Sequence, residues 1–477
     1  MNPVLVQFIN DNMAFVIIAA IALVGAIAAA VLLAVTTHGA KTGKGFFVAT
    51  KRLAVKYTLT GLLLVVLLFG NFVLYSFSGT ITLALCGSGL NVDEKAAAEA
   101  QKNSAELCVE IAEDGITLLK NKDNALPLTN NKINVFGWSG SKNGFVHQGA
   151  GSGGGTDTDI TDLYEGLRKS GMEINEELAA AYNAMPYERE GWAYYKLPEG
   201  DESFYTSERM QNAVNFSDQA IIVLGRKGGE TSDLPRYQHV KMTNKKNYDR
   251  IYSEISDLEE LMIQKVTENF KKVIIVFNTT NVMEAGFIEN DKISAAVAMY
   301  APGSKGSPAL GNLLMGKANF SGKTVDTWAY DLTTAAAFAN AGAEGTHVIK
   351  ANSSQNAYIS NYAEGVYEGY YWYETADKEG FWDSEFAKNR WNIKNGYKDV
   401  VQFPFGFGLS YTTFSWELEE LELPQYTKIT PETEITLKVF VKNTGDKDGK
   451  DVVELYCSLP YTKGGIEKPS EKLVGFA

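Results

Sequence analysis

The chain has 477 residues, enough for about two to four domains, and its 45% hydrophobic content can fill real cores. The formal net charge is −13. Residues 1–86 hold five basic residues and one acidic residue, so 39 basic and 56 acidic residues remain, a balance of −17. Because a protein needs a basic face to bind phosphate backbones, this balance argues against nucleic acid as a partner.

Cysteine and histidine usage argues against a metal site. The three cysteines are odd in number and far apart, so they encode neither a disulfide framework nor a CxxC pair. The four histidines are scattered and form no ligand cluster along the sequence. We therefore expect no metal and no cofactor, and look for the chemistry among carboxylates and hydroxyls.

Two long uncharged segments come first, residues 14–35 and 57–77. Each is long enough to cross about 30 Å of hydrocarbon as a helix. The basic residues between them favour a cytoplasmic loop by the positive-inside rule, although a buried hairpin in a soluble protein is the alternative. The sequence thus predicts a two-helix transmembrane hairpin over residues 1–87, a multi-pass cell-membrane location, and a soluble part on the extracellular side.

The next region, residues 88–345, alternates helices and strands. Helices are predicted over 93–113 and 258–269, and strands over 116–119, 133–138, 220–224, 273–278 and 293–299. Because the strands are near-continuous apolar runs that alternate with helices, they indicate an α/β fold. Its mainly parallel sheet should be covered by helices on both faces.

A glycine-rich run, GAGSGGGTDTD, spans Gly149–Asp159 and contains the spacing G-x-G-x-x-G. A dinucleotide site is one interpretation, but the preceding strand ends near Trp138, about ten residues too early for such a loop. The alternative is that small residues let the backbone approach a ligand or a neighbouring loop, while Asp157 or Asp159 caps the helix that runs to Leu167.

An aromatic-rich insertion follows over residues 186–205 and includes Trp192. Aromatic rings over a cleft can stack on sugar rings, since the axial hydrogens of a pyranose offer an apolar face. They can equally pack beneath a long loop.

The most informative stretch is IIVLGRKGGETSDLP, residues 221–235. Its apolar strand breaks at Gly225 into a glycine-containing loop that presents Glu230. Open α/β sheets place their ligand-facing groups at the carboxyl ends of parallel strands, so Glu230 is a candidate site residue. A solvated surface glutamate is the alternative interpretation.

Residues 346–477 differ in composition from the region before them. Residues 346–415 are rich in glycine and aromatic residues and predict a compact linker. From Ile435 the pattern alternates every two residues, typical of strands. A β-sandwich of two antiparallel sheets typically needs about seven strands, and about three or four can be counted over 416–477. This predicts a truncated all-β domain.

The order Arg226, Gly229, Glu230, Asp233 resembles the R-x-S-G-E-G-x-D-R loop of the glycoside hydrolase family 3 β-glucosidases. Residues 112–128, AEDGITLLKNKDNALPL, resemble the opening of that family's C-terminal α/β sandwich domain. Residues 301–322 match a further segment of it in their glycines. The resemblance implies the sandwich domain over 88–345 and a fibronectin type III-like domain over 416–477.

The resemblance also implies roles for individual residues. Glu230 would be the general acid/base, and Arg226, Gly229 and Asp233 would support its loop. Candidate substrate-binding residues are Ser152, Asp157 and Trp192.

Retaining glycosidases use a second carboxylate, about 5 to 5.5 Å from the first, as nucleophile. In this family the nucleophilic Asp belongs to a (β/α)8 barrel, and no segment here has barrel length. Some members are circularly permuted, with the sandwich ahead of the barrel. The resemblance thus implies the front part of a permuted, membrane-anchored, retaining β-glucosidase-like enzyme. Its barrel is expected downstream, its substrate is a glycoside or oligosaccharide, and this chain alone should be nearly inactive.

Two other functions stay open. One is a non-catalytic, membrane-tethered module that binds glycans or scaffolds a partner, and it applies if no Asp-bearing barrel follows. The other, more remote, is a nucleotide-binding α/β protein that uses the loop from Gly149 to Gly154.

Overall fold

The computed structural model describes most of the chain beyond residue 92. The described ranges are 93–149, 159–186, 197–230, 234–238, 247–340, 347–350, 356–359, 361–422, 428, 430 and 432–477, with a few isolated positions before residue 79. The chain divides into two compact units, residues 1–100 and 101–477, and everything below concerns the second unit unless stated.

The predicted membrane hairpin and localisation need correction. None of the helices in the described part of the chain combines the length and apolarity needed to cross a bilayer. Most of residues 14–35 and 57–77 lies outside the described residues. The prediction of a multi-pass cell-membrane protein with an extracellular soluble part is therefore wrong on this finding. An uncharged run is long enough to permit a span, but its length alone does not establish one.

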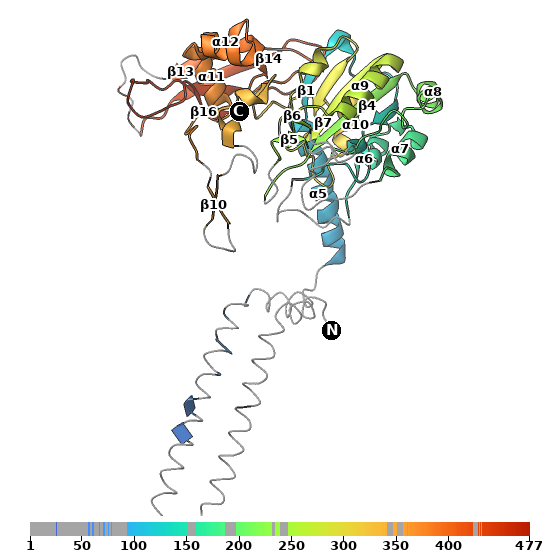
Figure 1. The fold of residues 1–477 in the computed structure, drawn as a ribbon, viewed down its shortest axis with the longest axis horizontal. Helices are drawn as coiled ribbons and strands as arrows, with labels where there is room; N and C mark the ends of the chain where they lie inside the picture. The colour runs from blue at the N-terminus through green and yellow to red at the C-terminus, as the bar shows by residue number, and fades with distance from the viewer. Residues whose placement is uncertain are drawn as a thin grey trace, which may run out of the picture. The chain divides into compact units, whose positions relative to one another are not determined.

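A six-stranded sheet forms the centre of residues 101–477, in the order β1-β8-β7-β4-β2-β3 (Figure 1). Its strands are β1 (Thr117–Asn121), β2 (Lys132–Phe136), β3 (Glu173–Ile174), β4 (Gln219–Arg226), β7 (Lys272–Thr279) and β8 (Ala295–Ala298). All neighbouring pairs are parallel except β1, which pairs antiparallel with β8 at one edge. The predicted mainly parallel sheet is confirmed.

Successive side chains of the central strands pack in two different hydrophobic cores, one on each face of the sheet. Ile221 and Val223 of β4 belong to a core on one face, with α6 and α10, whereas Ile222 and Leu224 belong to a core on the other face, with α8 and α9. Since side chains alternate across a strand, a strand buried on both faces must be apolar throughout. This is why β4 reads as one continuous apolar run. The helices are α5 (Glu94–Gly115), α6 (Leu163–Lys169), α7 (Glu176–Asn183), α8 (Ser207–Phe216), α9 (Asp257–Asn269) and α10 (Pro308–Leu314).

Helix α6 begins differently from the prediction. Its N-cap is Asp162, whose side chain accepts a hydrogen bond from the backbone N–H of Glu165 at 2.9 Å. Asp159 forms an ion pair with Lys305 instead, and Asp157 lies outside the described residues. The glycine run therefore ends before the cap, because the capping carboxylate must sit directly before the first helical turn.

Beyond residue 325 lies an aromatic subdomain and then two β-hairpins. The further helices are α11 (Tyr370–Lys378) and α12 (Glu385–Trp391), and β9 (Trp328–Ala329) pairs with β12 (Val401–Phe403). The hairpins are β13 (Phe414–Glu422) with β14 (Thr436–Asn443), and β15 (Glu454–Cys457) with β16 (Lys472–Phe476). The fibronectin type III-like assignment of 416–477, like the other domain boundaries, stays a prediction.

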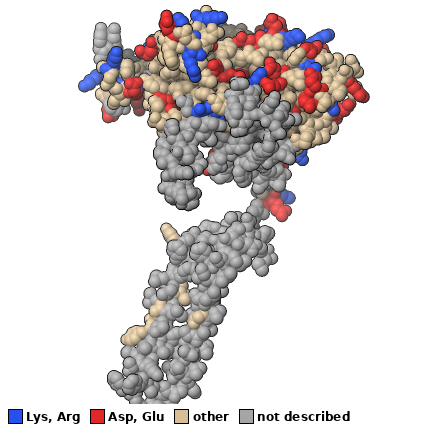
Figure 2. Space-filling model, viewed as in Figure 1, with Lys and Arg blue, Asp and Glu red and all other residues tan. Residues whose placement is uncertain are grey.

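Short elements complete the described chain. Two small hairpins pair β5 (Tyr237–Gln238) with β6 (Asn247–Ile251) and β10 (His347–Lys350) with β11 (Asn356–Ile359). The 3-10 helices are Lys122–Asn124, Trp138–Gly140, Gly286–Glu289, Leu332–Thr334, Ala336–Asn340, Phe381–Asp383 and Gly396–Asp399. Figure 2 shows acidic and basic side chains interspersed over the visible face of the described residues.

Candidate active site

The candidate acid/base, Glu230, lies four residues beyond the end of β4. β4 and β7 occupy the middle of the sheet and pair in register along their whole length, from Gln219 with Lys272 to Arg226 with Thr279. The side chain of Glu230 is exposed. A carboxylate is therefore presented to solvent at the carboxyl end of a central parallel strand, where ligand sites of open α/β sheets are found.

The loop that carries Glu230 starts from a buried arginine. Arg226 is 0% exposed and forms a bidentate ion pair with Glu259, with N–O distances of 2.8 and 2.9 Å. Its other N–H groups donate to the carbonyl oxygens of Tyr252 (2.7 Å), Gly225 (2.9 Å) and Glu254 (2.6 Å). All five guanidinium donors therefore have acceptors. Arg226 faces the protein interior, so it supports the loop and does not point into a cleft.

The ion pair with Glu259 favours the charged form of Arg226. Burial by itself lowers the pKa of Arg226, but the charge of Glu259 and its hydrogen bonds outweigh burial and raise that pKa. The Glu259 carboxylate also accepts a hydrogen bond from the backbone N–H of Ser256 at 2.7 Å. This bond is part of the capping box at the start of α9. Arg226 thus joins the end of β4 to the start of α9.

The next residues of the loop are held by Thr280, which directly follows β7. The hydroxyl of Thr280 accepts a hydrogen bond from the backbone N–H of Gly228 (2.9 Å) and donates one to the carbonyl oxygen of the same residue (3.2 Å). The backbone N–H of Thr280 donates to the carbonyl oxygen of Arg226 at 3.0 Å. Hydrogen bonds between the loop and Thr280 therefore continue beyond the end of β4 as far as Gly228, two residues before Glu230.

Two residues earlier, Asn278 ties together the loops on either side. Its side-chain amide donates to the carbonyl oxygens of Val146 (2.7 Å) and Tyr300 (2.6 Å), and its oxygen accepts from the N–H of Val146 (2.7 Å). Val146 follows β2 and Tyr300 follows β8. One fully buried amide thus fixes the positions of two chain segments that leave the same edge of the sheet.

The glycine run begins beside the Glu230 loop. A Cβ atom built on Gly149 would lie 3.2 Å from the carbonyl oxygen of Gly228, closer than most real contacts. This agrees with the interpretation that small residues allow a close backbone approach. β2 ends at Phe136, so the run does not follow its strand directly as a dinucleotide loop must.

The structure brings together only some of the predicted site residues. Arg226, Gly229 and Glu230 share one loop with Gly149 beside it. The other candidates, Ser152, Asp157, Trp192 and Asp233, lie outside the described residues.

A buried carboxylate, Glu199, escaped the sequence interpretation. It is 2% exposed and accepts hydrogen bonds from the backbone N–H of Trp138 (2.9 Å), the N–H of Gly200 (2.7 Å) and the hydroxyl of Tyr205 (3.0 Å). Burial raises the pKa of Glu199 to about 7 against the opposing effect of these donors. Glu199 thereby fastens the end of the aromatic insertion to the exit of β2. The sequence does not show its burial, which depends on the distant contact with the backbone of Trp138.

Another carboxylate with a raised pKa is Glu284, which is half-buried. Burial and the neighbouring charges of Glu254 and Asp331 raise its pKa to about 8. It accepts from the backbone N–H of Leu332 at 2.7 Å, so it braces the segment after β9. Within the described residues, no group of three His, Cys, Asp or Glu side chains could hold a metal ion.

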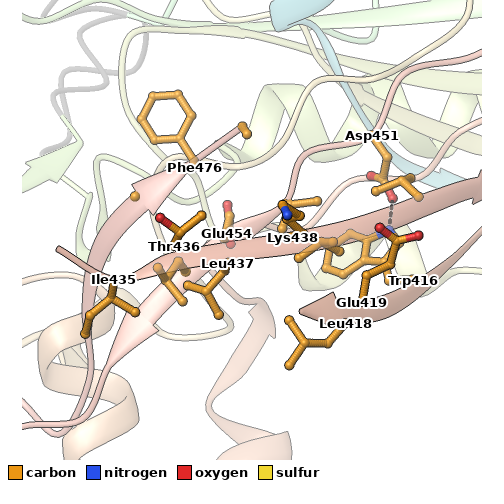
Figure 3. A pocket seen from close by; sticks show the side chains of 16 residues that line it. Trp416, Leu418, Glu419, Ile435, Thr436, Leu437, Lys438, Asp451, Glu454 and Phe476 are labelled. Carbon is orange, nitrogen blue, oxygen red and sulfur yellow. Dashed lines mark hydrogen bonds between the residues drawn. The ribbon is translucent and has the colours of Figure 1, made fainter. Parts of the chain in front are cut away.

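An open groove of the described residues lies elsewhere, between the two C-terminal hairpins (Figure 3). It has a volume of about 1230 Å3 and a mostly apolar lining that includes Trp416, Leu437, Leu455 and Phe476. Nothing in the described residues shows what covers it. Size alone does not make it the site, because it lies away from the sheet edge to which the candidate residues converge.

The fold and the loop carboxylate together define an α/β sandwich domain of the kind found in glycosidases. Residues 116–411 match the model of the glycosyl hydrolase family 3 C-terminal domain. Since this is more than half of the chain, the protein belongs to glycoside hydrolase family 3, which confirms the predicted family.

Similar proteins support the same assignment. The chain is 29% identical over 384 residues to a β-glucosidase of Ruminococcus albus and 30% identical over 405 residues to β-glucosidase A of Butyrivibrio fibrisolvens. These matches cover 78% and 79% of this chain but 34% and 44% of the relatives. The structure of β-glucosidase 3B from Thermotoga neapolitana, in complex with α-D-glucose, is 25% identical with a TM-score of 0.60, and the match covers 79% of this chain and 46% of that one. The chain thus spans less than half the length of these relatives.

Proposed function

We propose that the chain carries the general acid/base half of a retaining, β-glucosidase-like O-glycosyl hydrolase, with Glu230 in that role. The observation that supports this most is the placement of an exposed carboxylate on a loop that Arg226 and Thr280 fix at the carboxyl ends of β4 and β7. The loop lies within the residues that match the family model. The substrate would be a β-glucoside or a related oligosaccharide.

In this mechanism Glu230 donates a proton to the departing glycosidic oxygen and later accepts one from the attacking water. The first step needs a protonated carboxyl, whereas an exposed glutamate has a pKa of about 4.3. A nucleophile carboxylate brought close, together with a bound sugar that excludes water, would raise the pKa of Glu230.

The nucleophile would come from a (β/α)8 barrel outside residues 1–477, in the circularly permuted order predicted from the sequence. It would lie about 5 to 5.5 Å from Glu230 in the assembled site. The chain without such a barrel would then hydrolyse little. Gly229 and Asp233 would shape the loop, and Ser152, Asp157 and Trp192 remain candidates for contact with the sugar.

The test is hydrolysis of aryl β-glucosides by the protein expressed together with its barrel domain, comparing wild type with Glu230→Gln. Because proton transfer contributes about 10²- to 10⁴-fold, the variant should lose a factor in this range on a substrate with a poor leaving group. Its kcat/KM should fall much less on a dinitrophenyl glycoside, whose departure needs no proton, while kcat stays low because hydrolysis of the glycosyl-enzyme has lost its base. Azide should restore turnover of the activated substrate and give a β-glycosyl azide.

Glu202→Gln is a matched control, since Glu202 is a mostly exposed carboxylate paired with Lys265. It should leave both activities unchanged. Unchanged hydrolysis in Glu230→Gln would remove the acid/base assignment.

A second candidate is the non-catalytic glycan-binding or scaffolding module that the sequence left open. Calorimetric titration of the 477-residue chain with oligosaccharides distinguishes the two functions. Saturable binding, combined with no hydrolysis in any assembly with a barrel domain, would establish the binding module in place of the enzyme.

A further inference from the structure

Two polar side chains, Asn278 near the end of β7 and Thr280 directly after it, follow an apolar run. Residues two apart on an extended chain project to the same side. The contacts agree, because Asn278 binds the segments that follow β2 and β8, and Thr280 binds the loop that follows β4. One short stretch of chain thus touches the exits of three neighbouring strands.

Thr280 is the member of this pair that bears on Glu230. A hydroxyl has one proton to donate, and Thr280 donates it to the carbonyl oxygen of Gly228 while accepting from the N–H of the same residue. Both backbone polar groups of Gly228 are therefore held by a single side chain. Glycine has the widest backbone freedom of any residue, so this position has the most to gain from such a restraint.

Arg226 anchors the last residue of β4, and its contacts lie on the interior side, toward Tyr252, Glu254 and Glu259. Between Arg226 and Glu230 the chain passes two glycines, Gly228 and Gly229. The conformation at Gly228, which is not among the contacts described for Arg226, therefore contributes to the direction of Glu230.

We infer that Thr280 is a positioning residue for Glu230: its hydroxyl fixes the backbone at Gly228 and thereby the direction in which the acid/base carboxylate points. This inference rests on the proposed function. Asn278 extends the arrangement to the Gly149 segment, which approaches Gly228 within contact distance.

The first test uses the 477-residue chain itself. In Thr280→Val, which keeps the side-chain shape and removes the hydroxyl, hydrogen–deuterium exchange in the peptide covering residues 225–230 should accelerate about tenfold or more. Thr280→Ser keeps the hydroxyl and should exchange like wild type. Thr267→Val is the matched control, since the Thr267 hydroxyl is buried and bonds only to its own helix through Ile263 and Gln264. Unchanged exchange in Thr280→Val would overturn the inference.

The second test uses the protein assembled with its barrel domain. Thr280→Val should lower kcat about tenfold or more on a β-glucoside with a poor leaving group, with KM nearly unchanged. Measured as kcat/KM, which reports the step that releases the leaving group, the loss should be several-fold smaller on a dinitrophenyl glucoside, and Thr280→Ser should restore most of it. An equal loss on both substrates, or a loss matched by Thr267→Val, would indicate a purely structural role and overturn the inference.

The two proposals fail separately. If Glu230→Gln keeps full activity, the acid/base role is lost whatever Thr280 does. If Glu230→Gln is inactive on poor leaving groups while Thr280→Val behaves like wild type in both tests, only the positioning role is lost.

Discussion

The carboxyl edge of the central sheet and the pair of C-terminal hairpins are built in opposite ways. At the sheet edge Arg226 and Asn278 are both 0% exposed, and their polar groups meet backbone or carboxylate partners. In the hairpins Leu418 and Phe476 are 56% and 76% exposed beside an open groove. The loops at the sheet edge are therefore held by hydrogen bonds of buried side chains, whereas the hairpins leave large apolar side chains exposed.

The difference follows from where each region finds its neighbours. The central strands are covered on both faces by helices, so every side chain has a fixed environment. Each hairpin pairs only its own two strands, and a two-stranded sheet has little surface on which to bury its side chains. Substitutions that cost much at the sheet edge should therefore cost little in the hairpins.

The largest effect is expected for Arg226→Met, which leaves the Glu259 carboxylate buried without its partner. The free energy of unfolding should fall by about 3 to 5 kcal/mol, measured by urea denaturation. Arg168→Met is the control, because the Arg168–Glu176 pair is 45% and 66% exposed and contributes at most about 1 kcal/mol. Equal losses in the two variants would contradict the proposed difference between buried and exposed pairs.

Next come the apolar side chains of the two regions. Ile222→Ala, at a position that is 0% exposed in β4, should lower the free energy of unfolding by about 2 to 5 kcal/mol. Leu418→Ala in β13, where the side chain is 56% exposed, should stay within about 1 kcal/mol of wild type. A large loss in Leu418→Ala would show that the groove is covered in solution.

A pH effect is expected from Glu199, whose pKa in the folded protein is raised to about 7 by burial. An unfolded glutamate ionises near pH 4.3, so between about pH 4.3 and 7 the folded state holds a proton that the unfolded state has released. Stability is therefore greatest below this window, falls as the pH rises through it, and is constant above it. The decrease is at most roughly 4 kcal/mol.

Glu199→Gln should remove that part of the pH dependence between pH 5 and 8, measured as the difference between unfolding free energies at the two values. Glu417→Gln in β13 is the control, because Glu417 is exposed. An identical pH slope in Glu199→Gln and wild type would show that the carboxyl does not titrate as its burial indicates.

The smallest effect is expected where the two regions meet. Lys450 forms an ion pair with Asp114 at 2.8 Å, but the two side chains are 65% and 47% exposed. Lys450→Ala should shift the free energy of unfolding by less than about 1 kcal/mol. A loss of several kcal/mol in thermal denaturation would mean that this junction supports the hairpins more than their exposure suggests.

Much of the fold was predictable because its signals are local. The apolar runs at 220–224 and 273–278 predicted central strands, and β4 and β7 confirm them. The same alternation of strands and helices predicted the mainly parallel sheet, and the family motifs predicted a relationship that residues 116–411 confirm. The loop after β4 was also singled out correctly as the loop that presents Glu230 at the sheet edge.

Other predictions failed or could not be made, each for a physical reason. The cap of α6 was assigned to Asp157 or Asp159, but Asp162 provides it, because several nearby aspartates offer the same chemistry. The membrane location was inferred from uncharged length alone. Thr280 was missed because its partner is a backbone group far away in the sequence, and Glu199 because its burial and its bond to the backbone of Trp138 depend on the tertiary fold.

The sequence by itself determined the elements, the family and the candidate acid/base, since periodicity, glycine placement and motif spacing are properties of neighbouring residues. The tertiary structure decided what holds Glu230 in place. Only the adjacency of β4 and β7 brings Thr280 to Gly228, and only the packing of α9 beside β4 gives Arg226 its carboxylate 33 positions away. Such partners depend on which strands become neighbours, and that order is set by the burial of both sheet faces.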